Sequence, residues 1–90
     1  MRMHDLTNIA NHYGLKHQLV KCKEELGELI EAIDSTNDEA IIEEIADVEI
    51  MTEQLKQLMC ADRVVELYKD YKIARQIRRI AEEQSHECDN

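Results

Sequence analysis

The sequence predicts an all-α fold, a small antiparallel bundle of about four helices that is completed by oligomerisation. The chain of 90 residues contains no proline and two glycines, so few positions interrupt a helix. Apolar residues make up 43% of the chain and recur at helical spacing through long segments. No Trp or Phe and only three Tyr are available to fill a core, so we expect subunits to share part of their apolar surface.

The first two helices follow from apolar spacing and from a glycine between them. One helix is expected from Met3 to His12 and should stop at Gly14, a residue suited to a left-handed C-terminal cap. A second is expected from about Lys16 to Ile33, where apolar residues recur on one face. That face consists of Leu19, Cys22, Leu26, Leu29, Ile30 and Ile33.

A polar turn at residues 34–38 precedes the third expected helix. Thr36 followed by Glu39 fits a capping box, which would open this helix. The helix should extend to about Met59, with one apolar stripe facing the core. The stripe consists of Ile41, Ile45, Val48, Met51, Leu55 and Met59.

A break at residues 60–62 separates this helix from a fourth, which is expected to end near Gln84. The sequence contains neither an internal repeat nor the composition change that would mark a second domain. We therefore predict a single helical domain at residues 1–84 and a frayed polar tail at residues 85–90.

The charge of the chain excludes several classes of partner. A formal net charge of −9 argues against binding to a nucleic acid polymer or to an anionic membrane surface. With no apolar run of transmembrane length and no signal peptide, we expect no membrane association. Cys22, Cys60 and Cys88 lack C-x-x-C spacing and are typical of reduced thiols in a cytoplasmic protein.

Two carboxylate pairs are the strongest functional feature of the sequence. Glu25 and Glu28 lie at i, i+3 on the second expected helix, and Glu44 and Asp47 repeat that spacing on the third. Residues three apart on a helix are neighbours, so each pair can direct two carboxylates at one point. Four converging anions repel one another unless a cation lies among them, and ligation by oxygen alone suits Mg2+ or Mn2+.

The position of these acids relative to the core distinguishes them from the other acidic residues. Glu44 falls inside the apolar stripe of its helix, and Asp47 lies at the edge of that stripe. Glu25 flanks the apolar face of the second helix, and Glu28 lies one step further round. A buried carboxylate is costly unless it is paired or bound to a metal. The alternative is that acidic helices contain many such pairs by chance.

A second apolar strip lies on the opposite face of the third expected helix. Ile42, Ala46 and Ile50 form this strip, and a helix that is apolar on two sides needs two partners. One of them can be another subunit, so we expect a homodimer or a homotetramer.

The fourth expected helix reverses the charge of the chain. Lys72 and Arg75 lie on one face with Tyr68, in a segment that is mostly basic. Cations near an acidic metal site are what a polyphosphate ligand requires. Basic residues toward the end of a helix also complement its macrodipole and pair with acidic helices. The sequence leaves these two interpretations open.

Two segments resemble the signature of a known enzyme family. Residues 23–33, Lys-Glu-Glu-Leu-Gly-Glu-Leu-Ile-Glu-Ala-Ile, and residues 43–48, Glu-Glu-Ile-Ala-Asp-Val, resemble the E-x-x-E … E-x-x-D motif of MazG-type nucleotide pyrophosphohydrolases. These enzymes belong to the all-α NTP pyrophosphatase superfamily. The similarity covers roughly residues 15–80.

The resemblance implies an enzyme that hydrolyses a nucleoside or deoxynucleoside triphosphate to the monophosphate and pyrophosphate. It implies that the two carboxylate pairs are ligands of Mg2+, with Mn2+ as a substitute, and that a nucleotide is the substrate. Glu25 or Glu28 is then the catalytic carboxylate that orients or deprotonates water. Lys72 and Arg75 look like the phosphate-binding residues that family members carry on the following helix.

The chain departs from the family in having no Trp or Phe to hold a base. Only Tyr13, Tyr68 and Tyr71 are available for stacking, and Tyr68 is the candidate on the basic face. A broad house-cleaning activity or a non-nucleotide polyphosphate substrate stays open. The alternative function is a non-catalytic helical interaction or regulatory protein that retains the MazG-like fold. A di-iron carboxylate bundle would need histidine ligands on the core helices, which the sequence does not supply.

Overall fold

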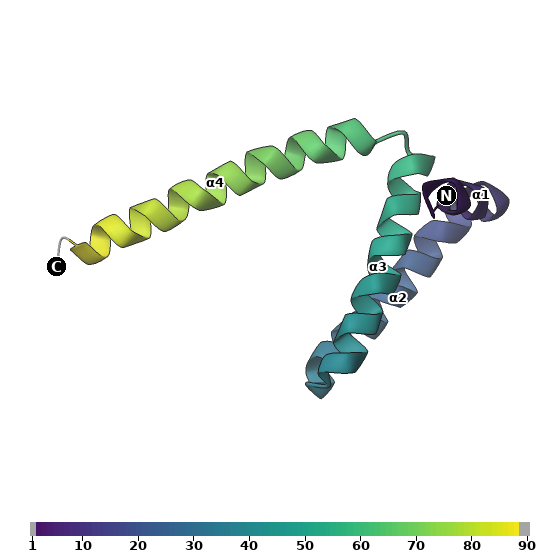
Figure 1. Cartoon of the computed structure of the whole chain (residues 1–90), viewed down its shortest axis with the longest axis horizontal. Coiled ribbons are helices and arrows are strands. Elements are labelled where there is room, and N and C mark those ends of the chain that lie inside the picture. Colours follow the sequence, from purple (N-terminus) through teal and green to yellow (C-terminus); the bar gives the residue numbers. More distant parts are fainter. Residues whose placement is uncertain (1, 89–90) are drawn as a thin grey trace.

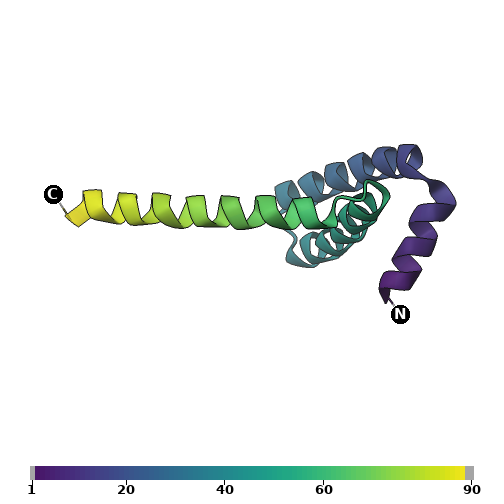
Figure 2. The ribbon, with the colours of Figure 1, turned by 90° about the horizontal axis from the view of Figure 1, so that it is seen from above.

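A computed structural model describes residues 2–88, which form four α-helices and no strand within that range. The all-α class predicted from the sequence is confirmed. Helices α2 and α3 form an antiparallel hairpin, α1 packs against both, and α4 extends away as a single long helix (Figures 1 and 2). The helices are α1, Arg2–Tyr13; α2, Leu15–Ser35; α3, Asp38–Leu58; and α4, Asp62–Cys88.

The connection between α1 and α2 is made at Gly14, as predicted. Gly14 has a φ of 83°, in the left-handed region that is costly for residues with a side chain. Its N–H donates a hydrogen bond to the carbonyl oxygen of Ala10 at 2.8 Å, which closes the end of α1. The chain therefore bends sharply at one residue, and α1 lies across the end of the α2–α3 hairpin (Figure 2).

The turn between α2 and α3 differs from the predicted capping box. Thr36 is the C-cap of α2, with a φ of 58° and an N–H that donates to the carbonyl oxygen of Ile33. Asn37 is the N-cap of α3, because its Oδ1 accepts a hydrogen bond from the N–H of Ala40 at 3.1 Å. The prediction that Thr36 and Glu39 form a capping box was wrong: a residue with left-handed backbone cannot also occupy the extended N-cap position.

Substitutions at this turn are expected to have opposite effects. Asn37→Ala should lower the free energy of unfolding by about 1 kcal/mol, because the N–H of Ala40 loses its acceptor. Thr36→Gly should be neutral or stabilising, since glycine adopts a positive φ without strain. Urea unfolding measures both changes. A larger loss of unfolding free energy for Thr36→Gly than for Asn37→Ala would contradict this assignment and support the capping box of Thr36 and Glu39.

The core of the described chain lies between the first three helices and is small. Its buried apolar side chains are Leu6, Ala10, Cys22, Ala32 and Met51. Two polar side chains, Gln18 and Gln54, are buried with them. The shared α2–α3 seam fixes the positions of the carboxylate pairs.

The break before α4 lies where the sequence predicts it. Cys60 has a φ of 53°, and the N–H of Ala61 bonds back to the carbonyl oxygen of Lys56 at 2.8 Å. Helix α4 then continues to Cys88, four residues past the expected end at Gln84. The segment expected to fray is therefore helical as far as Cys88, and residues 89–90 lie outside the described part.

Helix α4 buries none of its residues between Asp62 and His86. It packs only against α3, near its own beginning (Figure 1). Its exposed large apolar side chains are between 44% and 61% exposed and lie in two groups on opposite sides of the helix. Val64, Leu67, Tyr68 and Tyr71 form the apolar face of α4, and Ile73, Ile77 and Ile80 form a second group further along. Within one subunit, no other helix buries the apolar side chains of α4 between residues 62 and 86. None of the described helices has the length and apolar character needed to cross a membrane.

Candidate metal centre

The hairpin brings the two carboxylate pairs side by side. Glu25 and Glu28 precede the α2–α3 turn by nearly the same number of residues as Glu44 and Asp47 follow it. In an antiparallel hairpin, residues equidistant from the turn lie opposite one another. One carboxylate oxygen from each of Glu25, Glu28 and Glu44 lies within 4.8 Å of the others. Three of the four predicted ligands therefore converge from two helices.

Two oxygens of this cluster are buried without a hydrogen-bond partner. They are Oε2 of Glu25, whose side chain is only 12% exposed, and Oε2 of Glu44. Buried polar atoms are nearly always satisfied, and an unpaired carboxylate oxygen is among the costliest exceptions. The donors present are all hard oxygens, which fit Mg2+ or Mn2+ better than softer metals. The residues therefore fit a divalent cation.

The acid–base behaviour of Glu44 reflects this crowding. Burial is the largest cause that raises the pKa of Glu44 above its ordinary value. The negative charges of Glu28, Asp47 and Glu25 raise the pKa further. Two ionised carboxylates have no donor to share, and protonation of Glu44 would let it donate a hydrogen bond to Glu25, which raises the pKa as well. Either a proton or a cation relieves the same repulsion, so the two should compete for the site.

Asp47 lies beside the cluster without joining its closest oxygens. Its side chain is exposed, and its charge contributes to the raised pKa of Glu44. The three glutamates come together without it, which leaves its role as a ligand a prediction.

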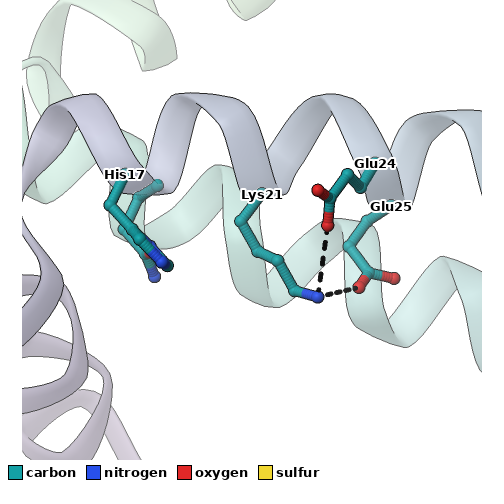
Figure 3. Close-up of polar contacts among 5 residues, drawn as sticks. His17, Lys21, Glu24 and Glu25 are labelled. Carbon is teal, nitrogen blue, oxygen red and sulfur yellow. Dashed lines mark hydrogen bonds and ion pairs between the residues drawn. The ribbon is translucent and has the colours of Figure 1, made fainter.

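The sequence interpretation missed Lys21. Its Nζ lies 3.6 Å from Oε1 of Glu25 and 3.4 Å from Oε2 of Glu24, on the same side of α2 (Figure 3). The hydrogen bond with Glu24 is the largest cause that raises the pKa of Lys21. The i, i+4 spacing of Lys21 and Glu25 was the signal that could have identified it. An ammonium group therefore already lies beside one candidate ligand.

The predicted basic residues do not reach the carboxylates within one subunit. Lys72, Arg75 and Tyr68 lie on α4, which has no contact with α2 in the part of the chain that the structure describes. The guanidinium of Arg75 instead lies over the ring of Tyr71, with Cζ 5.6 Å from the ring centroid. A phosphate bound at the glutamates could meet this basic face only on another subunit.

Comparison with known proteins provides no independent assignment. No protein-family model matches the chain, and no curated protein or solved structure is significantly similar to it. The resemblance to MazG-type enzymes rests on the motif alone, so its chemistry has to be argued from the residues of the site.

The raised pKa of Glu44 predicts how the stability of the metal-free protein depends on pH. The folded protein binds more protons than the unfolded chain between the ordinary glutamate pKa, about 4.5, and the raised pKa of Glu44. This contribution to stability is complete below that window and is lost as the pH rises through it. Thermal unfolding in EDTA should show Glu44→Gln gaining stability over wild type as the pH rises from about 4 to 7. A difference between the two proteins that stays constant with pH would contradict the prediction.

Proposed function

We propose that this protein is a Mg2+-dependent nucleotide pyrophosphohydrolase, which converts a nucleoside or deoxynucleoside triphosphate to the monophosphate and pyrophosphate. The observation that carries the proposal is the pair of buried, unpartnered oxygens of Glu25 and Glu44 inside a cluster of three glutamates. Such a cluster is unfavourable by itself and favourable around a hard cation. The E-x-x-E … E-x-x-D motif supports the choice of reaction.

Each residue of the site has a proposed part in this reaction. Glu25, Glu28 and Glu44 would hold the cation, with Asp47 as a further ligand from the edge of the cluster. A bound Mg2+ supplies charge stabilisation and a lowered pKa of water. Glu25 or Glu28 would orient or deprotonate the water that attacks phosphorus.

The basic face of α4 is proposed to bind phosphate between subunits. Lys72 and Arg75 lie on a helix that leaves its own hairpin, while the hairpin of every copy carries the acidic cluster. A homodimer or homotetramer would cover the exposed apolar face of α4 and could place these cations against the glutamates of another copy. Charge-assisted hydrogen bonds to a triphosphate would then hold the substrate.

An assay of product identity tests the proposed reaction. Purified protein is incubated with a panel of nucleoside and deoxynucleoside triphosphates plus Mg2+, and pyrophosphate and orthophosphate are measured separately. Pyrophosphate and the nucleoside monophosphate are expected as the first products. Arg75→Ala should weaken triphosphate binding roughly tenfold or more, since one such bond contributes about 1.5–3 kcal/mol. Arg78→Ala is the matched control. Orthophosphate as the first product would contradict the assignment.

A second candidate function is a non-catalytic helical interaction or regulatory protein. The exposed apolar face of α4 favours it, because a long helix without intramolecular partners is suited to binding another protein. Metal binding without hydrolysis of any triphosphate would favour this function over the enzyme. Either function is compatible with the proposed cytoplasmic location, which the free thiols of Cys22 and Cys60 support.

A further inference from the structure

A groove of about 550 Å³ opens between α1, α2 and α3, apart from the carboxylate cluster. It has apolar walls, including Ile9, Val20 and Met51, and several polar groups that the proposed hydrolysis does not use. The polar and aromatic lining consists of Tyr13, His17, Gln18, Lys21, Glu24 and Gln54, and Oε2 of Glu24 lies 3.4 Å from Nζ of Lys21. An apolar cleft with a few convergent polar groups is the usual form of a small-molecule site.

Two buried glutamines form part of the groove wall. Gln18 and Gln54 are 3% and 2% exposed, and they are the buried polar side chains of the described chain. Nε2 of Gln18 donates to Oε1 of Gln54 at 2.6 Å, and Oε1 of Gln18 pairs with Nδ1 of His17 at 2.7 Å. Each glutamine amide has two N–H donors and one acceptor oxygen. The Gln18–Gln54 and Gln18–His17 bonds do not use all of these donors and acceptors, so some can bond to a ligand in the groove. Neighbouring donors and acceptors of this kind match the edge of a nucleobase.

Two aromatic rings form another part of the lining. The rings of Tyr13 and His17 are stacked, with centroids 4.6 Å apart and an interplanar angle of 16°. His12 also packs edge-on against Tyr13, with centroids 4.7 Å apart and an interplanar angle of 87°. Tyr13 is nevertheless 51% exposed, so the Tyr13–His17 pair is accessible to a ligand. Planar bases stack on aromatic side chains because each base has a π-face. The groove therefore combines a stacking surface with hydrogen-bonding groups.

The groove lies along α2 at a suitable distance from the carboxylates. Gln18 and Glu25 are seven residues apart, which places them on the same face of the helix about 10 Å apart along its axis. Lys21 lines the groove and also contacts Glu25 at 3.6 Å (Figure 3). That separation is of the order of the distance between the base and the phosphates of an extended nucleotide. The groove and the cluster are thus consecutive parts of one surface.

We propose that this groove binds the base of the nucleotide whose phosphates lie at the carboxylate cluster, an inference that rests on the proposed function. Tyr13 stacks on the base, Gln18 and Gln54 bond to its edge, and Lys21 contacts the phosphates between the two sites. Tyr68, the stacking residue expected from the sequence, lies on α4 and does not line this groove.

Binding of nucleoside monophosphates in EDTA tests the groove without the metal. Ligand-observed NMR compares each monophosphate with ribose 5-phosphate, which has no base. Tighter binding of at least one monophosphate is expected, and Tyr13→Ala should weaken it about tenfold or more. Asn11→Ala, an exposed substitution on the same helix, is the control for folding. Gln54→Leu should change the preference among bases, and circular dichroism checks that all three variants fold.

The outcomes separate this proposal from the proposed reaction. Base-dependent binding that requires Tyr13, in a protein that hydrolyses no triphosphate, supports the groove and overturns the enzyme. Hydrolysis with no preference for a base over ribose 5-triphosphate supports the enzyme and overturns the groove. Loss of binding in Tyr68→Ala but not in Tyr13→Ala also overturns it. Light scattering that shows Ile9→Glu breaking the oligomer would assign the groove to a second copy of the chain instead.

Discussion

Replacing Glu44 by glutamine is expected to stabilise the metal-free protein and to abolish its response to Mg2+. The substitution removes a charge that burial and three neighbouring carboxylates disfavour, so the melting temperature in EDTA at pH 7 should rise. Mg2+ should raise the melting temperature of wild type, because it binds only the folded site, and should leave Glu44→Gln unchanged. Hydrolysis should fall by at least about 100-fold, since even residues behind a metal ligand contribute roughly 10–100-fold.

The matched control for this variant is Glu43→Gln. Glu43 is the exposed neighbour of Glu44 on α3, and its substitution changes the net charge equally. We expect little change in stability, in the Mg2+ response or in hydrolysis. Wild-type hydrolysis in Glu44→Gln would remove Glu44 from the catalytic site. Equal effects of the two substitutions would show that only the overall charge matters.

A charge introduced on the apolar face of α4 is expected to break the assembly. Light scattering of wild type at micromolar concentration should give a multiple of the 10.5 kDa subunit mass. Leu67 is 61% exposed in the single chain, and an interface would bury it. Leu67→Glu should then cost on the order of 3–5 kcal/mol of association free energy, as an unpaired buried charge does. It should also reduce hydrolysis, if the site needs Lys72 and Arg75 of another subunit.

Gln76→Glu is the control for Leu67→Glu. It adds the same charge to α4 at an exposed polar position, nine residues further along and therefore on the opposite face of the helix. This variant should keep the wild-type mass and activity. A wild-type protein that scatters as a monomer would contradict the proposed assembly and would leave the apolar face of α4 for a different partner.

The sequence predicted the helices well because their signals are local. Apolar spacing located the second and third helices, and the break at residues 60–62 located the start of the fourth. Gly14 marked the first turn because glycine adopts a positive φ at low cost. The cap at the second turn was misassigned, since Thr36 and Asn37 are both good cap residues. Which of the two takes the left-handed position depends on how α2 and α3 pack, and local sequence does not contain that information.

The course of α4 could not be predicted for a related reason. The apolar periodicity of a helix indicates which of its faces is apolar, but not which helix or subunit packs against that face. The direction of α4 is set by the short link with Cys60 at positive φ, and its packing within the subunit is confined to α3. The basic face was therefore expected close to the carboxylates, whereas one subunit keeps the two apart.

The candidate site was predictable where helical spacing determines it. The i, i+3 pairs identified the glutamates, and the antiparallel hairpin brings three of them together. Lys21 was overlooked because an i, i+4 pair of opposite charge is common on exposed helices. The groove was not visible in sequence, since Tyr13, Gln18 and Gln54 come from three helices and meet only in the folded chain.

The most direct test of the central claim is a titration of the protein with Mn2+, monitored by electron paramagnetic resonance. Wild type should bind Mn2+ saturably, with Mg2+ as a competitor, because Glu25, Glu28 and Glu44 present converging oxygens and Oε2 of Glu25 and of Glu44 is buried and unpartnered. Glu25→Gln should remove this binding, and the exposed Glu24→Gln should retain it. Weak, non-saturable binding that is the same in all three proteins would contradict the claim that this cluster is a divalent-cation site.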